Sequence, residues 1–270
     1  MDTGIERIML LKVPIDIVPP EEFPNVISRI LQSAGTPAGT STGTPAGTPA
    51  GVPANSRDIV LLSLWDLLRA RRNNEYRKYV LNAALVIPIS KSIVGGAKFL
   101  TGKKPVRYMP FHFVISLLTL LEKQEYPLYL LGGKSRILKK AERNISSTFP
   151  RLKIVGRFEG KIRKREEPSV VEAIRKSSPC MLLAGKGIRR EELWIARNSR
   201  RLNSGLRLWC SDLFEVFAEK KRRPSDAVFE IGLESIGFCL RNPLLFFRIF
   251  PYFRYKFLLL FYKIFVKDNR

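Results

Sequence analysis

One stretch in the middle of the chain limits the choice of fold more than any other. A short apolar run, Leu128–Leu131, is interrupted by Gly132-Gly133. Apolar residues then recur at the spacing of an amphipathic helix, at Ile137, Leu138, Ala141 and Ile145. Phe149-Pro150 ends this pattern, and a second β-rich run at residues 152–155 stops at Gly156. The order predicts one strand–glycine turn–helix–strand unit, as found in α/β proteins.

The glycine turn is also a candidate phosphate site. It places glycine backbone and a helix N-terminus at the carboxyl end of a strand, where N–H groups and the helix dipole favour an anion. A second turn of this kind, Gly185-Lys186-Gly187, follows an apolar run at residues 181–184. Any α/β protein needs tight turns, so a purely structural role is the alternative. The candidate anion-binding residues are Gly132, Gly133, Lys134, Gly185, Lys186, Gly187 and Arg190.

The rest of the chain continues the alternation of strands and helices. Further strands are expected at residues 7–13, 58–62, 84–87, 181–184 and 206–210. Helices are expected through residues 22–31, 65–72, 75–81, 91–100 and 111–121, and around Glu191 and Trp194. We therefore predict an α/β fold with a three-layer, Rossmann-like parallel sheet flanked by helices.

Two segments differ in character from this α/β body, which we assign to residues 1–242. Residues 35–54 repeat Thr, Pro, Ala and Gly, a composition that cannot bury a core, so a disordered loop insertion is expected over residues 34–56. Because it falls between an expected helix and an expected strand, it expands a loop rather than marking a domain boundary. The second segment, residues 243–270, is a C-terminal appendage.

The appendage carries an aromatic stripe at helical spacing, formed by Phe246, Phe250, Phe253, Phe257, Leu260, Phe261 and Ile264. Basic residues lie mostly off this stripe, at Arg248, Lys256, Lys263 and Lys267. No apolar run approaches the roughly 20 residues that span a bilayer. A basic amphipathic helix of this kind favours the interface of an anionic membrane. A terminal helix docked on the body is the alternative.

Composition narrows the choice of partners. The 270 residues include 47 Lys and Arg against 24 Asp and Glu, a net charge of +23, which calls for an anionic partner such as phosphates or an anionic membrane surface. Nucleic acid is a third option, but the sequence contains no recognised nucleic-acid-binding motif. We therefore expect the protein not to bind nucleic acid. The three cysteines lack Cys-x-x-Cys spacing, so neither a disulfide framework nor a metal site is expected. The N-terminus lacks the pattern of a signal peptide.

Several motifs resemble those of one family of bacterial enzymes. Leu130-Leu-Gly-Gly-Lys134 and Phe149-Pro-Arg-Leu-Lys-Ile-Val-Gly156 resemble the WecG/TagA/CpsF family of N-acetylmannosaminyl- and N-acetylmannosaminuronyl-transferases. Further matches are Val13-Pro-Ile-Asp16, Trp194-Ile-Ala-Arg-Asn198, and Gly232-Leu-Glu234 followed by Pro243. They occur in the family's order over nearly the whole chain.

The resemblance implies transfer of an N-acetylmannosamine-type sugar from a UDP-sugar to a polyprenyl-diphosphate-linked acceptor, in the synthesis of cell-surface polysaccharide. It implies a peripheral protein at the cytoplasmic face of the bacterial inner membrane, in contact with an anionic membrane surface. No cofactor is implied beyond the donor substrate. No metal is implied either, because the family is not known for an Asp-x-Asp metal motif and this sequence contains none. The resemblance does not decide whether the protein forms a homo-oligomer.

The second glycine turn departs from the family in part. The family pattern Gly-x-Gly-Ser-Pro-Lys-Gln-Glu, followed by x-Trp, reads here Gly185-Lys-Gly-Ile-Arg-Arg-Glu-Glu192 with Trp194. Both glycines, Glu192 and Trp194 match, and Arg190 keeps a cation. Glu191 stands where the family has a Gln that contacts the donor. A carboxylate there would repel a diphosphate unless it is paired.

The catalytic positions depart further. The family's proposed general base is an Asp, and its position here is Ile89, which cannot accept a proton. The family's Thr-x-Asn strand reads Leu61-Leu62-Ser63, while Arg107 corresponds to a family arginine. His112, the only histidine, falls near a later family Asp and is a candidate base. The sequence Phe111-His112-Phe113 also suits a half-buried packing position.

Two hypotheses follow. An active glycosyltransferase would use Arg107, His112 and Ser63 as catalytic residues, with Asp66 and Ser90 as weaker substitutes for the missing base. Ser63 more readily makes a backbone hydrogen bond than acts as a nucleophile, because no triad pattern supports it. A catalytically degenerate member would keep the fold and bind a nucleotide sugar, or act as a scaffold at the membrane, without turnover.

Overall fold

The sheet at the centre of the molecule is parallel, which confirms the predicted fold class. The computed structural model describes residues 5–35, 57–202, 204–223, 225–231 and 250–265. Six strands lie in the order β4-β3-β8-β7-β5-β6, and each neighbouring pair is parallel. They are β3 (Asp58–Leu62), β4 (Leu85–Pro88), β5 (Leu128–Leu131), β6 (Ile154–Phe158), β7 (Met181–Ala184) and β8 (Leu206–Trp209).

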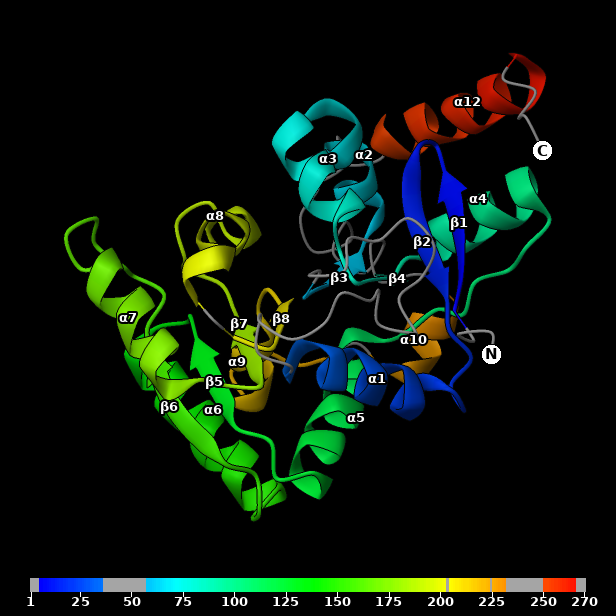
Figure 1. Cartoon of the computed structure of the whole chain (residues 1–270). Helices are drawn as coiled ribbons and strands as arrows, with labels where there is room; N and C mark the ends of the chain where they lie inside the picture. Colours follow the sequence, from blue (N-terminus) through cyan, green and yellow to red (C-terminus); the bar gives the residue numbers. More distant parts are fainter. Residues whose placement is uncertain (1–4, 36–56, 203, 224, 232–249, 266–270) are drawn as a thin grey trace.

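Helices cover both faces of this sheet and complete three layers (Figure 1). One face carries α1 (Phe23–Gly35), α5 (Pro110–Lys123), α6 (Ser135–Thr148) and α9 (Leu213–Phe217). The other carries α2 (Leu64–Arg72), α3 (Asn74–Leu81), α7 (Glu167–Ser177) and α8 (Glu192–Leu202). Successive side chains of a strand point to opposite faces, and the core divides accordingly. Leu128 and Leu130 pack with α5 and α6, whereas Leu131 packs with α7 and α8.

The strand predicted at residues 7–13 is confirmed only as far as Leu10, and its continuation to residue 13 is wrong. The structure has an antiparallel hairpin of β1 (Glu6–Leu10) and β2 (Val13–Ile17) instead. Leu11 and Lys12 form its two-residue turn, with φ angles of 50° and 67°. Such turns favour Asn-Gly or Asp-Gly, so Leu-Lys carries no hairpin signal in the sequence. The side chain of Leu11 is buried, which offsets the cost of its left-handed backbone.

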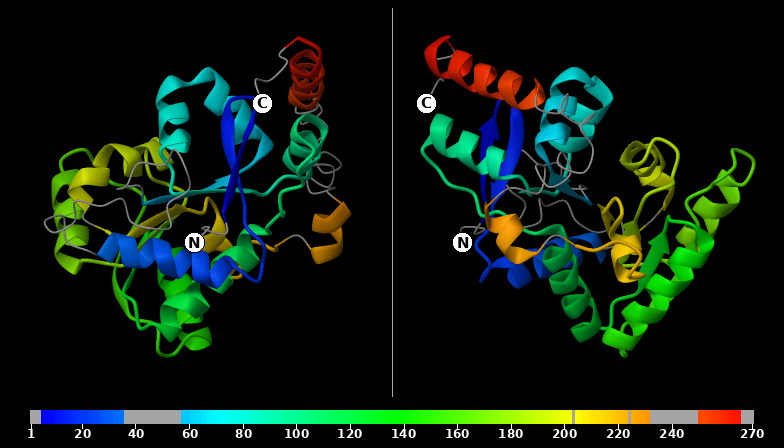
Figure 2. Two further views of the ribbon diagram at one scale, coloured as in Figure 1. Left: turned by 45° about the vertical axis from the view of Figure 1, so that its right-hand side comes forward. Right: turned by 180° about the vertical axis from the view of Figure 1, so that it is seen from behind.

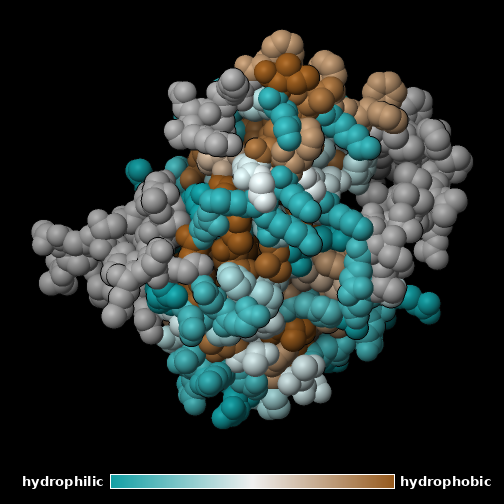
Figure 3. Space-filling view, turned by 90° about the vertical axis from the view of Figure 1, so that its right-hand side faces the viewer, coloured by the Kyte–Doolittle hydropathy of each residue, from teal (hydrophilic) through white to brown (hydrophobic). Residues whose placement is uncertain are grey.

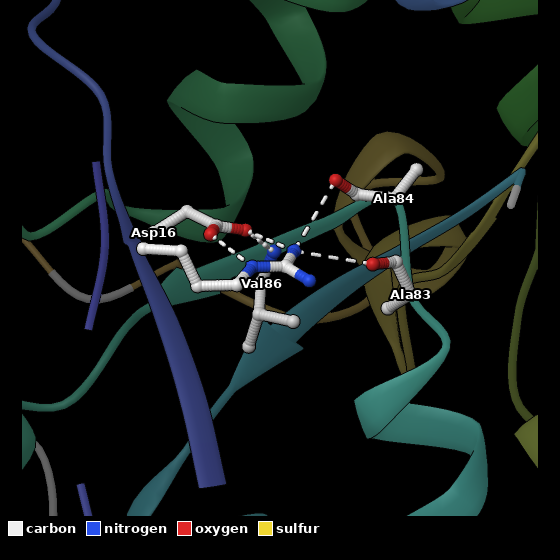
Figure 4. A network of polar contacts seen from close by, with 5 residues as sticks. Asp16, Ala83, Ala84 and Val86 are labelled. Carbon is white, nitrogen blue, oxygen red and sulfur yellow. Dashed lines mark hydrogen bonds and ion pairs between the residues drawn. The ribbon is translucent and has the colours of Figure 1, made fainter. Parts of the chain in front are cut away.

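Asp16, the last residue of the Val-Pro-Ile-Asp motif, joins this hairpin to the edge of the sheet (Figure 4). Its carboxylate is fully buried and accepts two hydrogen bonds from Arg7, at 2.6 and 2.8 Å. It also accepts the backbone N–H of Val86 on β4 at 2.7 Å. Arg7 in turn donates to the carbonyls of Ala83 and Ala84. The hairpin is therefore attached to β4 through a buried ion pair whose two members are both hydrogen-bonded.

The strand that the sequence predicts to stop at Gly156 continues through it to Phe158. A Cβ atom at Gly156 would lie 2.4 Å from the ring of Tyr129 on β5. The glycine therefore makes room for an aromatic ring on the neighbouring strand and does not end β6.

The C-terminal helix α12 (Phe250–Phe265) lies beside α4 (Lys91–Thr101) at one end of the molecule (Figures 1 and 2). Tyr255 and Leu259 are buried in this contact, and the Tyr255 hydroxyl donates to the carbonyl of Ser92 at 3.0 Å. A Cβ atom at Gly96 would lie 1.9 Å from the Tyr255 hydroxyl. The close approach of α12 therefore requires glycine at this position of α4.

The other side of α12 is an exposed aromatic face. It consists of Phe250, Phe253, Phe257, Leu260, Phe261, Ile264 and Phe265, which are between 43% and 77% exposed. Figure 3 shows apolar side chains gathered at this end of the molecule. Within the described ranges, no helix is both long and apolar enough to cross a membrane. The helix is therefore docked, as the alternative interpretation held, and it also presents an amphipathic outer surface.

Several sequence-based expectations fall outside the described residues. These are the Thr/Pro/Ala/Gly tract at residues 36–56, the Gly232-Leu-Glu234 motif and the start of the appendage at residues 243–249. The tract joins α1 to β3, two elements of the same three-layer body. Its disorder and the boundary at residue 242 remain predictions.

The two neighbouring glycines of α4 provide a matched test of the docking of α12. Gly96→Ala is expected to lower the free energy of unfolding by about 1–3 kcal/mol, because the added methyl group must displace Tyr255. Gly95→Ala meets nothing within 4 Å and is expected to raise it by up to about 1 kcal/mol, because alanine favours a helix. Urea denaturation measures both variants. Equal effects would show that α12 does not rest on Gly96.

Candidate functional site

The carboxyl edge of the sheet opens where neighbouring strands lead to opposite faces, and two of these openings involve the candidate residues. β5 leads into α6 on one face, while its neighbour β7 leads into α8 on the other, so the following loops diverge. β3 leads into α2 and its neighbour β8 into α9, again on opposite faces. Crevices at such points are the usual ligand sites of open α/β sheets. The two glycine turns lie at the first opening, and a cleft lies at the second.

Backbone hydrogen bonds join the glycine turns to neighbouring loops and strand ends. Four of their N–H groups donate to carbonyl oxygens: Gly132 to Phe158 (2.9 Å), Gly133 to Lys186 (2.6 Å), Gly185 to Leu131 (2.7 Å) and Lys186 to Ser211 (2.7 Å). A Cβ atom at Gly132 would lie 2.5 Å from the carbonyl oxygen of Gly185. These glycines allow the backbones to touch, and four of the N–H groups expected at a phosphate already have backbone partners.

Exposed positive charge surrounds the first opening. Lys134 is the N-cap of α6, no side chain caps this helix, and its first turn contains no acidic residue. Lys186 and Arg190 are exposed as well. The helix dipole and these cations favour an anion at this edge of the sheet. An anion here would meet the terminus of α6 and basic side chains rather than the four engaged N–H groups.

Arg190 and Glu191 both adopt left-handed backbone conformations, with φ of 65° and 51°. Such conformations cost of order 1–3 kcal/mol each for residues other than glycine. They carry the chain from the second glycine turn into α8, which begins at Glu192. Glu191 is exposed, and its role in contacting a donor remains a prediction.

The cleft at the second opening has a volume of ≈ 370 Å³. Residues of β3 and β8 line its base, and α2, α3 and the start of α8 supply most of its polar groups. Those polar groups include Ser63, Asp66, Arg69, Tyr76, Glu191 and Glu192. A concave site with converging polar groups at this edge of the sheet is a typical place for a substrate.

Ser63 and Asp66 form a capping box at the start of α2. The N–H of Asp66 donates to Ser63 Oγ at 3.3 Å, and the N–H of Ser63 donates to Asp66 Oδ2 at 3.0 Å. Burial raises the pKa of Asp66. Ser63 therefore makes the backbone hydrogen bond that the sequence favours over a nucleophilic role. Ser90 Oγ accepts the N–H of Leu64 at 3.1 Å, and Ile89, which the resemblance predicts to replace a general base, lines the cleft.

Glu192 is a buried carboxylate of the cleft. Its side chain is 6% exposed, and its Oε1 accepts a hydrogen bond from Arg69 Nη1 at 2.8 Å. Arg69 also stacks on Tyr76, with its guanidinium carbon 4.2 Å from the ring centroid. Burial raises the pKa of Glu192 to about 6, and the negative charges of Asp66 and Glu191 add to the rise. Its Oε2 has no hydrogen-bond partner within the described part of the chain.

Arg107 lies next to Ile89, the position at which the resemblance predicts a missing base. Its Nε donates to the carbonyl of Ile89 at 3.0 Å. Its guanidinium lies 3.6 Å from the ring centroid of Phe229 on α10 (Asp226–Ile231). Burial lowers the pKa of Arg107. A catalytic role for this residue remains a prediction, whereas its contact with the Ile89 backbone is a structural fact.

His112 is exposed, so the half-buried packing position expected for it is wrong. Its Nε2 lies 2.8 Å from Arg223 Nη1 and 3.6 Å from Asp226 Oδ1. It belongs to the first turn of α5 and is not among the residues that line the cleft. The structure thus brings Ser63 and Glu191 together at the cleft and places His112 on a charged surface.

Sequence reasoning did not identify Glu192 or Arg69 as site residues. Glu192 matches the last residue of the family pattern at the second glycine turn, and this match was the available signal. Arg69 offers no such signal, because 123 positions separate it from Glu192 in the chain. The two meet only because α2 and α8 cover the same face of the sheet.

Comparisons with known proteins identify the family of this chain. The model of the glycosyl transferase WecG/TagA/CpsF family matches residues 50–270. A relative from Bacillus subtilis (strain 168), N-acetylglucosaminyldiphosphoundecaprenol N-acetyl-beta-D-mannosaminyltransferase, is 21% identical over 174 residues, which cover 64% of this chain and 67% of the relative. Because the family match spans most of the sequence, the chain belongs to the WecG/TagA/CpsF family of glycosyltransferases.

Proposed function

We propose that the protein transfers an N-acetylmannosamine-type sugar from a UDP-sugar to a polyprenyl-diphosphate-linked acceptor, in polysaccharide synthesis at the cytoplasmic face of the bacterial inner membrane. Family membership supports a glycosyltransferase. The name of the Bacillus subtilis relative supports this sugar and a lipid-linked diphosphate acceptor. The observation that carries the proposal is exposed positive charge beside a polar cleft, at the carboxyl edge of a parallel sheet.

The donor diphosphate would bind at the first opening. Negative charge on the departing diphosphate grows in the transition state, so cations placed there stabilise it. Lys134, Lys186 and Arg190 offer such cations. Lys186 donates its N–H to the carbonyl of Ser211, which also lines the cleft. A donor held at the glycine turns would therefore have its sugar within reach of the cleft.

The acceptor would approach from an anionic membrane surface. The aromatic face of α12 is exposed, and Arg254, Lys256 and Lys263 on the same helix are exposed as well. Aromatic rings insert among lipid headgroups while the cations attract anionic lipids. This arrangement supports the peripheral attachment of the protein to the membrane.

A catalytically degenerate member is the second candidate. It is favoured by Ile89, an apolar side chain at the position of the family's proposed base. Such a protein would bind the nucleotide sugar, or act as a scaffold at the membrane, without transferring the sugar.

Two measurements together separate these candidates. UDP and UDP-N-acetylmannosamine are titrated calorimetrically into the protein, with and without anionic vesicles that contain a lipid-linked N-acetylglucosamine acceptor. The same mixtures are assayed for released UDP. Binding with acceptor-dependent release supports the transferase, and binding without release identifies the degenerate member. No binding overturns both.

Lys134→Ala is expected to weaken UDP binding by about ten- to 150-fold, because a hydrogen bond to a charged group contributes about 1.5–3 kcal/mol. Lys139→Ala, which removes an exposed lysine further along α6, is the matched control and should leave the affinity unchanged. Calorimetry measures both. An unchanged affinity in Lys134→Ala would show that the diphosphate does not bind at this helix terminus.

A further inference from the structure

The cleft contains a carboxylate oxygen that the fold leaves without a partner. Among the residues that the structure describes, Glu192 Oε2 makes no hydrogen bond and is shielded from solvent, while Oε1 accepts from Arg69. The whole side chain is 6% exposed. Leaving a buried charged atom unsatisfied costs free energy, so such an atom calls for an explanation other than stability.

The surroundings of Glu192 hold its carboxylate in place. Arg69 approaches from α2 and fixes Oε1, and Tyr76 of α3 stacks against the guanidinium of Arg69. Glu192 is also the first residue of α8, where the helix dipole favours a negative charge. Arg69 therefore anchors one oxygen, and the other has no partner among the described residues.

The charged and titratable groups around Glu192 come from four parts of the fold. Arg69 and Asp66 lie on α2, Glu191 precedes α8, and Asp212 follows β8. Tyr76 and Tyr79 of α3 remain neutral, since burial raises the pKa of both phenols. Burial and the two nearby carboxylates outweigh the backbone N–H of Glu192 and the charge of Arg69, which both favour the ionised form, so the pKa of Glu192 rises to about 6. The carboxylate is then ionised at neutral pH and still basic enough to take a proton.

We propose that Glu192 accepts the proton of the acceptor hydroxyl, in place of the carboxylate that Ile89 cannot supply. This assignment rests on the transferase function proposed above. The hydroxyl oxygen forms a bond to the anomeric carbon of the donor sugar while the bond from that carbon to the phosphate oxygen breaks. The departing nucleoside diphosphate keeps the electron pair, and the hydroxyl proton moves to Oε2. Because Oε2 is shielded in the structure, this transfer requires the carboxylate to rotate about its terminal bond, whose torsion is soft, and to shift its hydrogen bond with Arg69.

Asp66 is less suited to this role, although it lines the same cleft. Its Oδ2 accepts hydrogen bonds from both the N–H and the hydroxyl of Ser63. These bonds cap α2, so the carboxylate of Asp66 already has a structural task. Oε2 of Glu192, in contrast, makes no hydrogen bond to any of the described residues.

Glu192→Gln in the full-length protein tests the assignment. Glutamine keeps an oxygen for Arg69 but cannot take a proton. Acceptor-dependent UDP release is expected to fall about 10²–10⁴-fold, while the affinity for UDP stays unchanged. The wild-type rate should fall as the pH drops through about 6, and this acid limb should be absent from the residual activity of the variant. Glu172→Gln, on α7 and outside the cleft, is the control and should keep the wild-type rate.

Thermal unfolding shows whether a lost rate comes from lost folding. The folded pKa of Glu192, about 6, lies above the ordinary value of 4.5. The ionised side chain therefore destabilises the fold fully above pH 6, and this cost disappears as the pH falls below 4.5. At about pH 8, Glu192→Gln should unfold at a temperature no lower than the wild type. If the variant unfolds at a lower temperature than the wild type, its lost rate no longer tests the role of Glu192. The pH profile of the wild-type rate is then the test, and a profile without the acid limb overturns the assignment.

The outcomes distinguish this assignment from the proposed function. Wild-type protein that binds the donor and releases no UDP overturns the transferase proposal, and the role of Glu192 falls with it. Wild-type protein that releases UDP, together with a folded Glu192→Gln variant of equal rate, overturns the role of Glu192 alone.

Discussion

Replacing Asp16 with alanine is expected to lower the free energy of unfolding by about 3–5 kcal/mol. The substitution leaves Arg7, whose side chain is 10% exposed, without its bidentate partner. It also removes the acceptor for the N–H of Val86 on the edge strand β4. Single domains have a total stability of about 5–15 kcal/mol, so this loss would leave a substantial unfolded fraction. Urea denaturation followed by circular dichroism measures it.

Glu6→Ala is the matched control for Asp16→Ala. Glu6 belongs to the same hairpin and pairs with Lys103, but the two side chains are 48% and 52% exposed. Exposed ion pairs contribute about 0–1 kcal/mol, so this variant should be close to wild type. Asp16→Asn keeps an acceptor for Val86 and should lose less than Asp16→Ala. A loss below about 1 kcal/mol in Asp16→Ala would show that the hairpin is not attached through this pair.

A double variant, Phe253→Asp with Phe257→Asp, is expected to bind anionic vesicles about 10²–10⁴-fold more weakly. Burying one phenylalanine contributes about 1.5–3 kcal/mol, and the two side chains are 67% and 68% exposed on α12. The introduced carboxylates also repel the anionic surface. Vesicle sedimentation over a range of lipid concentrations measures the partitioning.

Val155→Asp is the control for this double variant. Val155 is 42% exposed on β6. The change therefore replaces an exposed apolar side chain with a carboxylate, but at a position away from α12. Its binding to vesicles should remain within about fivefold of wild type, because a single charge near an anionic surface contributes about 1 kcal/mol. Wild-type binding by the double variant would argue that the aromatic face does not contact lipid. An equal loss in both proteins would assign the effect to charge alone.

Elements whose signals lie within a short stretch of sequence were predictable. The apolar run of β5, its glycine turn and the helical spacing of α6 are adjacent in the chain, and the structure confirms all three. Alternation of strands and helices was enough to predict a parallel sheet in three layers. Helix α7 was not predicted, although Val170, Val171 and Ile174 recur at helical spacing and are buried.

Features that depend on tertiary contacts were not predictable. The turn at Leu11 and Lys12 contains no residue that favours a left-handed backbone, and its hairpin depends on the buried contact of Asp16 with β4. β6 continues through Gly156 because the ring of Tyr129, on another strand, covers that position. In both cases the deciding atoms belong to residues distant in the chain.

In the candidate site, too, features with a local sequence signal were predictable and features that depend on tertiary contacts were not. The sequence places both glycine turns at strand ends, which is where they lie. It does not show that the carbonyls of Phe158, Lys186 and Ser211 accept the N–H groups of these turns. The raised pKa of Glu192 is likewise a product of burial and of neighbours that only folding brings together.

Tyr255 attaches the aromatic face to the body that contains the cleft, through its contact with Gly96 and its hydrogen bond to Ser92. A groove of ≈ 720 Å³ lies between α2 and α12, and Arg69 lines both this groove and the cleft. If α12 rests on a membrane, its docking on the body sets the height of the cleft above the lipid headgroups. A sugar carried by a lipid could enter only when its diphosphate linker spans that height. The protein would thus discriminate among acceptors by the length of their head groups as well as by their chemistry.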